Sequence, residues 1–265
     1  MKRKTFLLLL AAGAIFAQQT KPVTATSTFY DVVDANERAF VDFSKNATKK
    51  LVEAMMKDDP SVRSVVFSVR LFGGNPEPAG RYRLVIMRDG FPPSNTGRLA
   101  PLSMTATGMS YEDYMNKAAS LRKRTGQTLR QRMASTSSEK PVELAEGDII
   151  LTDLMKIMPD RTMDYFNMER NDWQPMHAER VKEGAIKSWS LWTFRSPSGA
   201  SRSYDAMTAT VHKDLDSAMS GGNYGAMYAK LHPGQSMAGL TDRARTVRTI
   251  MRSDYWRVLW ALTRP

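Results

Sequence analysis

The chain has 265 residues, with 38 lysines and arginines against 27 aspartates and glutamates, which gives a formal net charge of +11. The absence of cysteine excludes disulfides, a lipoprotein anchor, covalent haem attachment and thiolate metal sites. Basic and acidic residues are interspersed along the chain, whereas a nucleic-acid-binding protein usually gathers its positive charge on one face, so we expect no nucleic-acid partner.

The first 17 residues have the pattern of a secretory signal peptide. Basic residues at 2–4 precede an apolar run over 6–16, and Ala17-Gln18 forms a cleavage point. The run is about 11 residues, too short to cross a bilayer comfortably, although an uncleaved N-terminal anchor is the alternative. Cleavage removes three basic and no acidic residues, which lowers the charge from +11 to +8. We therefore predict an exported protein, periplasmic or secreted, with no transmembrane segment in the mature chain.

The first half of the predicted fold covers residues 29–146, after a polar segment over 18–28 that predicts a flexible lead-in. Its first helix begins at Asp34, with Glu37 placed for a capping box, and ends near Pro60. The other predicted elements of this half are strands over 29–33, 61–72 and 81–89, a loop over 90–110 and a helix over 111–134.

The second predicted half covers residues 147–265 and begins with the same order of elements. It contains strands over 148–157, 186–195, 203–213 and 256–263, and helices over 160–183, 214–231 and 241–252. Glycines at 221, 222 and 225 interrupt the helical region over 214–231. They predict a flexible loop, and the alternative with a functional role is a lid over a pocket.

The two halves align at a nearly constant offset, which favours an internal duplication. A shift of 125 places Phe67 on Trp192, and a shift of 126 in the helix places Leu51 on His177. Few residues are identical, and any two βαββ segments can align to this extent. Each half then reads β-α-β-β-α-β, the ferredoxin-like unit, whose bare apolar sheet face would pack against that of the other half.

The sequence resembles a known superfamily in its central region. The run VKEGAIKSWSLWTFRSPSGASRSYDAMTATV, after a helix that carries WQPMHAER, is similar to the dimeric α/β-barrel superfamily, and more narrowly to its uncharacterised secreted bacterial members. The resemblance is good over residues 148–213 and architectural elsewhere. It implies an α+β fold in which two ferredoxin-like halves form a pseudo-dimeric α/β barrel. That superfamily includes cofactor-free monooxygenases, haem-binding chlorite dismutase-like proteins and stress proteins, so it implies no single function.

The helix over 160–183 carries polar groups on a face that should be buried. One stripe contains Met163, Phe166, Arg170, Trp173, His177 and Val181. Buried polar groups without partners are costly, so Arg170 and His177 need hydrogen bonds, a ligand or water. The first half has Ala47 and Leu51 in place of Trp173 and His177, so the polar and aromatic residues occur in one half only.

These residues predict a pocket between this helix and the sheet, lined by Trp173, His177 and the sheet aromatics Trp189 and Trp192, with Arg170 or Tyr204 beside them. The alternative is a core histidine that bonds a backbone carbonyl or a sheet hydroxyl. Alternation places Trp189 and Trp192 on opposite faces of their strand. In the next strand it places Tyr204, Thr208, Thr210 and His212 on one face, with His212 exposed at the strand end.

We expect a small-molecule-binding protein whose ligand the sequence does not identify. One alternative is a cofactor-free monooxygenase-like enzyme with His177 as the base, and another is a structural or partner-binding envelope protein without a pocket. No cofactor and no metal are predicted, because His177, His212 and His232 lack ligand spacing. The haem-binding relatives imply haem on His177 as a further alternative. The sequence leaves room for a homo-oligomer.

Overall fold

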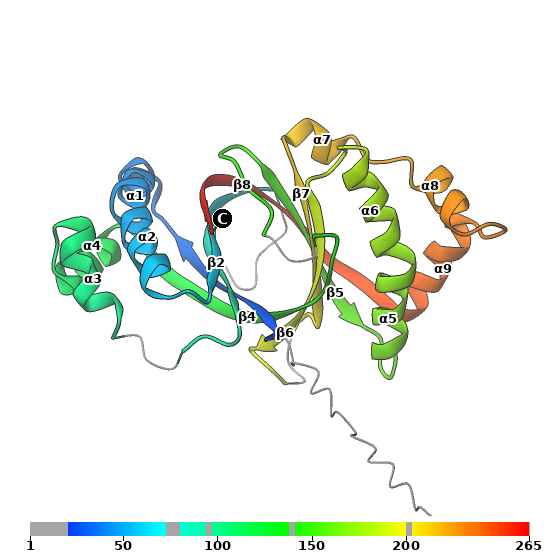
Figure 1. Ribbon diagram of the computed structural model, residues 1–265, viewed down its shortest axis with the longest axis horizontal. Helices are drawn as coiled ribbons and strands as arrows, with labels where there is room; N and C mark the ends of the chain where they lie inside the picture. The colour runs from blue at the N-terminus through cyan, green and yellow to red at the C-terminus, as the bar shows by residue number, and fades with distance from the viewer. Residues whose placement is uncertain (1–20, 73–79, 94–96, 138–140, 200–202, 265) are drawn as a thin grey trace, which may run out of the picture.

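The described residues form an eight-stranded closed barrel with helices on two opposite sides (Figure 1). A computed structural model describes residues 21–72, 80–93, 97–137, 141–199 and 203–264. The predicted signal peptide, residues 1–17, lies outside the described residues. None of the helices in the described part of the chain is long and apolar enough to cross a membrane.

All strand pairs of the barrel are antiparallel, in the order β1-β3-β2-β8-β5-β7-β6-β4. Each half contributes four strands in the ferredoxin-like order, β4-β1-β3-β2 and β8-β5-β7-β6. The strands are β1 (Val23–Asp31), β2 (Val62–Phe72), β3 (Tyr82–Asp89), β4 (Lys123–Ser135), β5 (Ile149–Ile157), β6 (Ser188–Ser196), β7 (Ala206–His212) and β8 (Arg248–Thr263).

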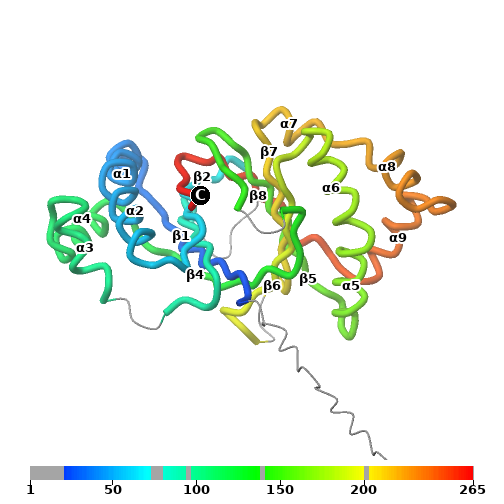
Figure 2. The backbone as a smooth tube through the Cα atoms, viewed as in Figure 1, coloured from blue at the N-terminus to red at the C-terminus, as the bar shows by residue number. Residues whose placement is uncertain are grey.

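Two long strands join the halves. The first part of β8 pairs with β5, and its last part, from Tyr255 to Thr263, pairs with β2. Likewise β4 pairs with β1 and then, from Leu129 to Ser135, with β6. The red end of the tube in Figure 2 therefore returns from the helices of the second half to lie beside β2 of the first.

The helices of each half cover the outer face of that half's strands. In both halves the first long helix contains a π-helical turn: Ser44–Thr48 between α1 (Glu37–Phe43) and α2 (Lys49–Asp58), and Glu169–Trp173 between α5 (Thr162–Met168) and α6 (Gln174–Lys182). The remaining helices are the 3-10 turn Asp34–Asn36, α3 (Leu99–Thr107), α4 (Tyr111–Leu121), α7 (Leu215–Met219), α8 (Tyr224–Leu231) and α9 (Met237–Val247).

Apolar side chains form a core on each side of the barrel wall. Phe40, Phe67 and Trp260 pack beneath the first set of helices, and Tyr165, Trp189 and Tyr228 pack beneath the second. Inside the barrel lie Phe29, Ile150, Leu154, Trp192 and Trp256. Strands buried on both faces carry large apolar groups at successive positions, which explains the pattern of β6.

Several predicted boundaries are wrong. The lead-in ends earlier than predicted, because the strand-forming threonines at 24, 26 and 28 belong to β1. The loop over 90–110 contains α3, whose Pro101 sits in the first turn, where proline is tolerated. The predicted helix over 111–134 ends at Leu121, and β4 follows. The Lys/Arg-rich sequence of β4 does not show the apolar alternation of a strand, because Arg130 occupies a position that is buried inside the barrel. The final strand begins at Arg248 instead of Trp256.

The proposed residue pairing between the halves is also wrong in places. Phe67 packs beneath the helices, whereas Trp192 lies inside the barrel, so a shift of 125 pairs opposite faces of β2 and β6. A one-residue change of register exchanges the two faces of a strand, and a shift of 124 places Phe67 on Leu191, which faces the helices. The two π-helical turns are related by a shift of 125, which pairs the buried Val52 with His177.

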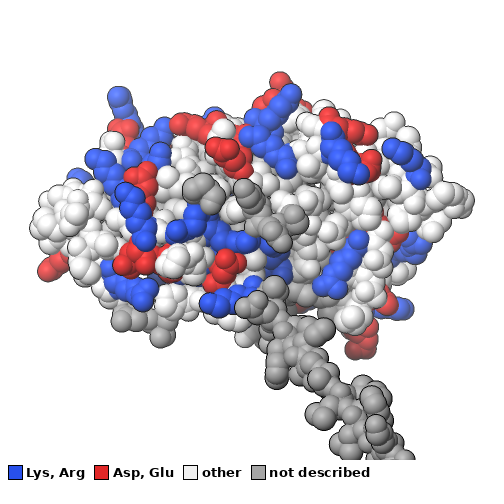
Figure 3. All heavy atoms as spheres, in the orientation of Figure 1, with Lys and Arg blue, Asp and Glu red and all other residues white. Residues whose placement is uncertain are grey.

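Charged side chains of both signs share the surface. On the face shown in Figure 3, acidic side chains stand among the basic ones over both halves of the molecule. This arrangement agrees with the interspersed charge of the sequence and differs from a continuous basic face.

Candidate functional site

A cavity of about 220 Å³ lies between α6 and the outer face of the second-half strands. The π-helical turn before α6 contributes Glu169 and Trp173, and α6 itself contributes His177. These residues are spaced by four and so lie on successive turns of one face. Strands β5 and β7 form the floor. The segment from Ala218 to Tyr224, which joins α7 to α8, borders the cavity on the remaining side.

Aromatic rings form one wall of this cavity. The His177 ring stacks on Trp189, with centroids 5.1 Å apart and planes inclined by 10°. The Trp173 ring lies 6.3 Å from the His177 ring at an angle of 26°, and Tyr224 meets the His177 ring edge-on at 6.1 Å. Trp189 is 1% exposed, so it is a fixed part of the core, whereas Trp173 is only partly buried.

Several nitrogen atoms around the cavity have no hydrogen-bond partner. Among them are His177 Nδ1, Trp173 Nε1 and both ring nitrogens of His212, although the backbone of Ser217 lies beside His212 and opposes the lowering of its pKa. Burial lowers the pKa of His177 to about 3, and the positive charge of Arg180 acts in the same direction. Burial and Arg180 also lower the pKa of His212 to about 4. Both imidazoles are therefore neutral near pH 7.

Two acids and two arginines face the same space. Glu169 Oε1 lies 3.3 Å from Arg248 Nε, an ion pair without the alignment of a hydrogen bond. Burial raises the pKa of Glu169 to about 7, against the opposing effect of Arg248. Burial also raises the pKa of Asp153, whose Oδ1 accepts a hydrogen bond from Ser253 Oγ at 2.5 Å. Arg180 donates to the Tyr224 hydroxyl and lies over the Tyr224 ring.

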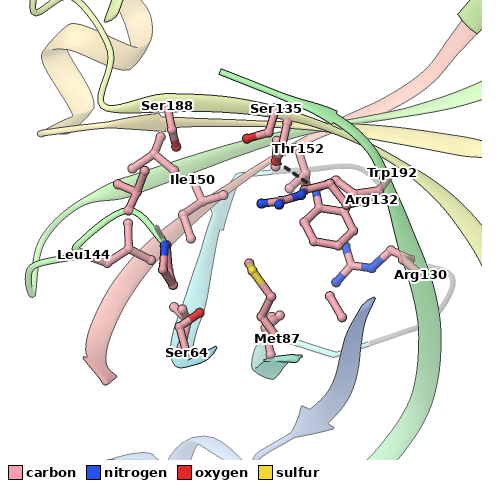
Figure 4. A pocket seen from close by; sticks show the side chains of 18 of the residues that line it. Ser64, Met87, Arg130, Arg132, Ser135, Leu144, Ile150, Thr152, Ser188 and Trp192 are labelled. Atoms are coloured by element: carbon pink, nitrogen blue, oxygen red, sulfur yellow. Dashed lines mark hydrogen bonds between the residues drawn. The ribbon is translucent and has the colours of Figure 1, made fainter. Parts of the chain in front are cut away.

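The structure brings together three of the predicted site residues: Trp173, His177 and Trp189 line the cavity. Trp192 lies on the opposite face of β6 and lines a second cavity inside the barrel (Figure 4). Tyr204 also borders the barrel interior, because β7 begins at Ala206 and the predicted alternation does not extend back to residue 204.

Arg170 and Met163 lie outside the cavity, and the π-helical turn gives the reason. A π-helical turn holds more residues than an α-helical one, so a stripe drawn at α-helical spacing drifts across it. As a result Glu169, which is 2% exposed, faces inward where α-helical spacing had predicted Arg170. Arg170 is exposed and donates to the Met133 carbonyl at 3.4 Å, and Met163 is 66% exposed.

Sequence reasoning missed most of the polar residues around the cavity. His212 is 2% exposed, so the prediction that it is exposed is wrong. It lies beside Thr208 and Thr210 on the predicted face, and that alternation was the signal that could have found it. Glu169 lies four residues before Trp173 and was available by helical spacing. Arg180, Tyr224 and Arg248 come from separate elements, and no spacing in the sequence joins them to the site.

Comparison with known proteins identifies the fold. A candidate monooxygenase from Fusobacterium nucleatum aligns with a TM-score of 0.59 at 12% identity, covering 93% of this chain and 96% of that one. A candidate monooxygenase from Lactobacillus acidophilus aligns with a TM-score of 0.51 at 7% identity, covering 92% and 96%. No family model and no curated protein matches the sequence. At this level of identity the likeness shows the fold alone: the chain shares the α+β barrel architecture of these two proteins.

Proposed function

We propose that this protein binds a small planar molecule in the cavity between α6 and the second-half strands. The partly buried Trp173, beside His177 and Trp189, offers flat apolar surface on which a ring can stack. Polar side chains of both signs surround the wall, which suits a ligand with hydrogen-bonding groups and no large net charge. The combination of an apolar wall and a few convergent polar groups is typical of small-molecule sites.

The observation that carries this proposal is the set of unpartnered buried nitrogens on the wall. Leaving a buried donor or acceptor unpaired costs roughly 1–3 kcal/mol each. His177 Nδ1, Trp173 Nε1 and the His212 nitrogens all border one cavity, where a ligand or ordered water can satisfy them together. The first half has the apolar Val52 at the position of His177 in the π-turn alignment, and a packed helix there needs no polar group.

Base catalysis by His177 has less support. A general base works best with a pKa near the working pH, and the pKa of His177 is lowered to about 3. The role that the site favours for His177 is hydrogen bonding to a ligand by its neutral ring. Haem on His177 remains a prediction of the sequence resemblance, and titration with hemin tests it. A Soret band that His177→Leu abolishes would replace the present proposal with a haem site.

Export and duplication remain proposals from the sequence. Residues 1–17 support export, and cell fractionation with immunoblotting tests it: a full-length chain found only in the cytoplasm would contradict it. The shared strand order and the two π-helical turns support a pseudo-dimer of duplicated halves. Superposition of the halves on their strands tests that proposal. The duplication fails if α1–α2 and α5–α6 do not overlie each other.

A thermal-shift screen at pH 7.5 against planar heteroaromatic compounds and quinones tests the binding proposal. A ligand at about 100 times its Kd stabilises the folded state by roughly 2.7 kcal/mol, so we expect at least one compound to raise the melting temperature by several degrees. His177→Leu should be as stable as the wild type, because it removes an unpartnered polar group, and it should lose the shift.

Arg170→Ala is the matched control, because Arg170 lies on the same helix but faces solvent. It should keep the full ligand-induced shift. A His177→Leu variant that is clearly less stable and still shows every shift would exclude His177 from the site. A screen in which no planar compound shifts the wild type would count against this ligand class.

A further inference from the structure

The barrel interior holds a second cavity, which the proposed function does not use. Its volume is about 110 Å³, and none of its lining residues borders the helix–sheet cavity (Figure 4). The barrel wall separates the two spaces, since Trp189 faces one and Trp192 faces the other. The two cavities are therefore separate candidate sites.

Two buried arginines face this cavity without a carboxylate partner. Arg83 and Arg130 are each 4% exposed, and neither forms an ion pair with any described residue. Arg83 Nε donates to Ser68 Oγ at 3.1 Å, and its guanidinium lies over the Trp256 ring. Arg130 reaches Ser27 Oγ and the Met207 sulfur, and its Nε has no partner. All these contacts are neutral.

The charge of the barrel interior is unbalanced among the described residues. Arg83, Arg130, Arg132 and Arg252 line the barrel cavity and the smaller space that adjoins it, together with one acid, Asp254. Asp254 Oδ2 lies 2.8 Å from Arg252, and the charge of this one carboxylate also acts on Arg83, so a single acid faces several arginines. Burial lowers the pKa of Arg130 to about 10 and that of Arg83 well below its ordinary value, yet both stay protonated at neutral pH in practice. A buried cation needs a counter-charge.

The rest of the cavity is apolar, and its two ends differ. In Figure 4, Arg130 and Arg132 lie at one end beside Trp192, and Leu144 and Ile150 lie at the opposite end. Val66, Val85 and Val211 are among the other lining residues. An inorganic anion would satisfy the arginines but leave this apolar length unfilled. A ligand with an anionic head and an apolar chain matches both ends.

We infer that the barrel binds a small aliphatic monocarboxylate, with its head on Arg83 and Arg130 and its chain directed toward Leu144 and Ile150. A carboxylate accepts hydrogen bonds from guanidinium groups in a geometry that phosphate shares and neutral ligands lack. One water-sized group needs about 10–15 Å³ on the scale of this cavity volume, so the space holds a ligand of on the order of ten non-hydrogen atoms. Octanoate has that size.

The test compares octanoate with 1-octanol, sodium sulfate and sodium chloride, each titrated into purified protein and followed by calorimetry and by melting temperature. Octanoate should bind and raise the melting temperature by several degrees, and 1-octanol should not, because it lacks the charge. Arg130→Met should weaken octanoate binding by roughly tenfold or more, while Arg130→Lys should restore part of it. Arg170→Met, which removes one exposed positive charge, should bind like the wild type.

A second variant guards against misfolding of Arg130→Met. Leu144→Gln leaves every arginine in place and should weaken octanoate binding without changing the response to sulfate. Equal shifts with octanoate and 1-octanol, equal shifts with octanoate and sulfate, or wild-type affinity in Arg130→Met would each overturn the inference. His177→Leu should leave octanoate binding unchanged, so a failure here and a failure of the helix–sheet site can be told apart.

Discussion

Acidification from pH 6.5 to pH 4.5 should lower the free energy of unfolding by about 2 kcal/mol in total, and His177→Leu should remove most of that loss. His177 has a pKa of about 3 in the folded protein and 6.5 when unfolded. The unfolded chain therefore binds more protons in this range, so stability is lost as the pH falls. Urea unfolding at a series of pH values measures the effect.

The variant isolates His177 because the other groups are the same in both proteins, and the shifts of His212 and Glu169 oppose each other. His212, with a pKa of about 4, also loses stability as the pH falls. Glu169, with a pKa raised to about 7 from 4.5, binds its proton more readily when folded, so it adds stability as the pH falls from 7 to 4.5. These two slopes nearly cancel between pH 6.5 and pH 4.5. Parallel stability curves for the wild type and His177→Leu would contradict the buried, neutral state assigned to His177.

Trp189→Ala should lower the free energy of unfolding by about 3–5 kcal/mol, while Trp173→Ala should cost less than half as much. Trp189 is 1% exposed and packs in the core beneath the second set of helices, so its removal leaves a large void. Trp173 is partly buried and borders open space on two sides, where it lines two cavities. Guanidinium denaturation of both variants at pH 7.5 compares them.

The paired design separates the structural and ligand-binding parts of one aromatic wall. Trp173→Ala should lose the shift produced by a planar ligand while it keeps most of its stability. Comparable losses of stability in the two variants would mean that Trp173 is a core residue, and the cavity would then lose one of its walls.

The fold was predictable where apolar periodicity is strong. The residues of β2, β3, β5 and β6 alternate or run apolar, and their predicted ranges agree with the structure within a few residues. The sequence does not reveal β4, because Arg130 and Arg132 occupy positions that only a closed barrel makes internal. The last part of β4 pairs with β6, a strand of the other half. The local residue pattern of β4 carries no information about that partner.

The candidate site was partly predictable for a similar reason. Trp173 and His177 follow from spacing along one helix, and Trp189 from alternation along one strand. The prediction that Arg170 lines the cavity is wrong because no residue pattern indicates the π-helical turn at Glu169–Trp173. Arg248 and Tyr224 reach the cavity from β8 and α8, elements that meet α6 only in three dimensions.

The double pairing of β8 constrains how the molecule can assemble. Because this strand supplies a neighbour to both β5 and β2, the ring of strands cannot close until the residues of β8 have been synthesised. A chain truncated before Arg248 would expose two unpaired strand edges, which are templates for aggregation. Once the ring is closed, every strand of the described barrel has two neighbours, so a second copy finds no free edge there for strand addition. A homo-oligomer, if one forms, would have to use the helices or loops.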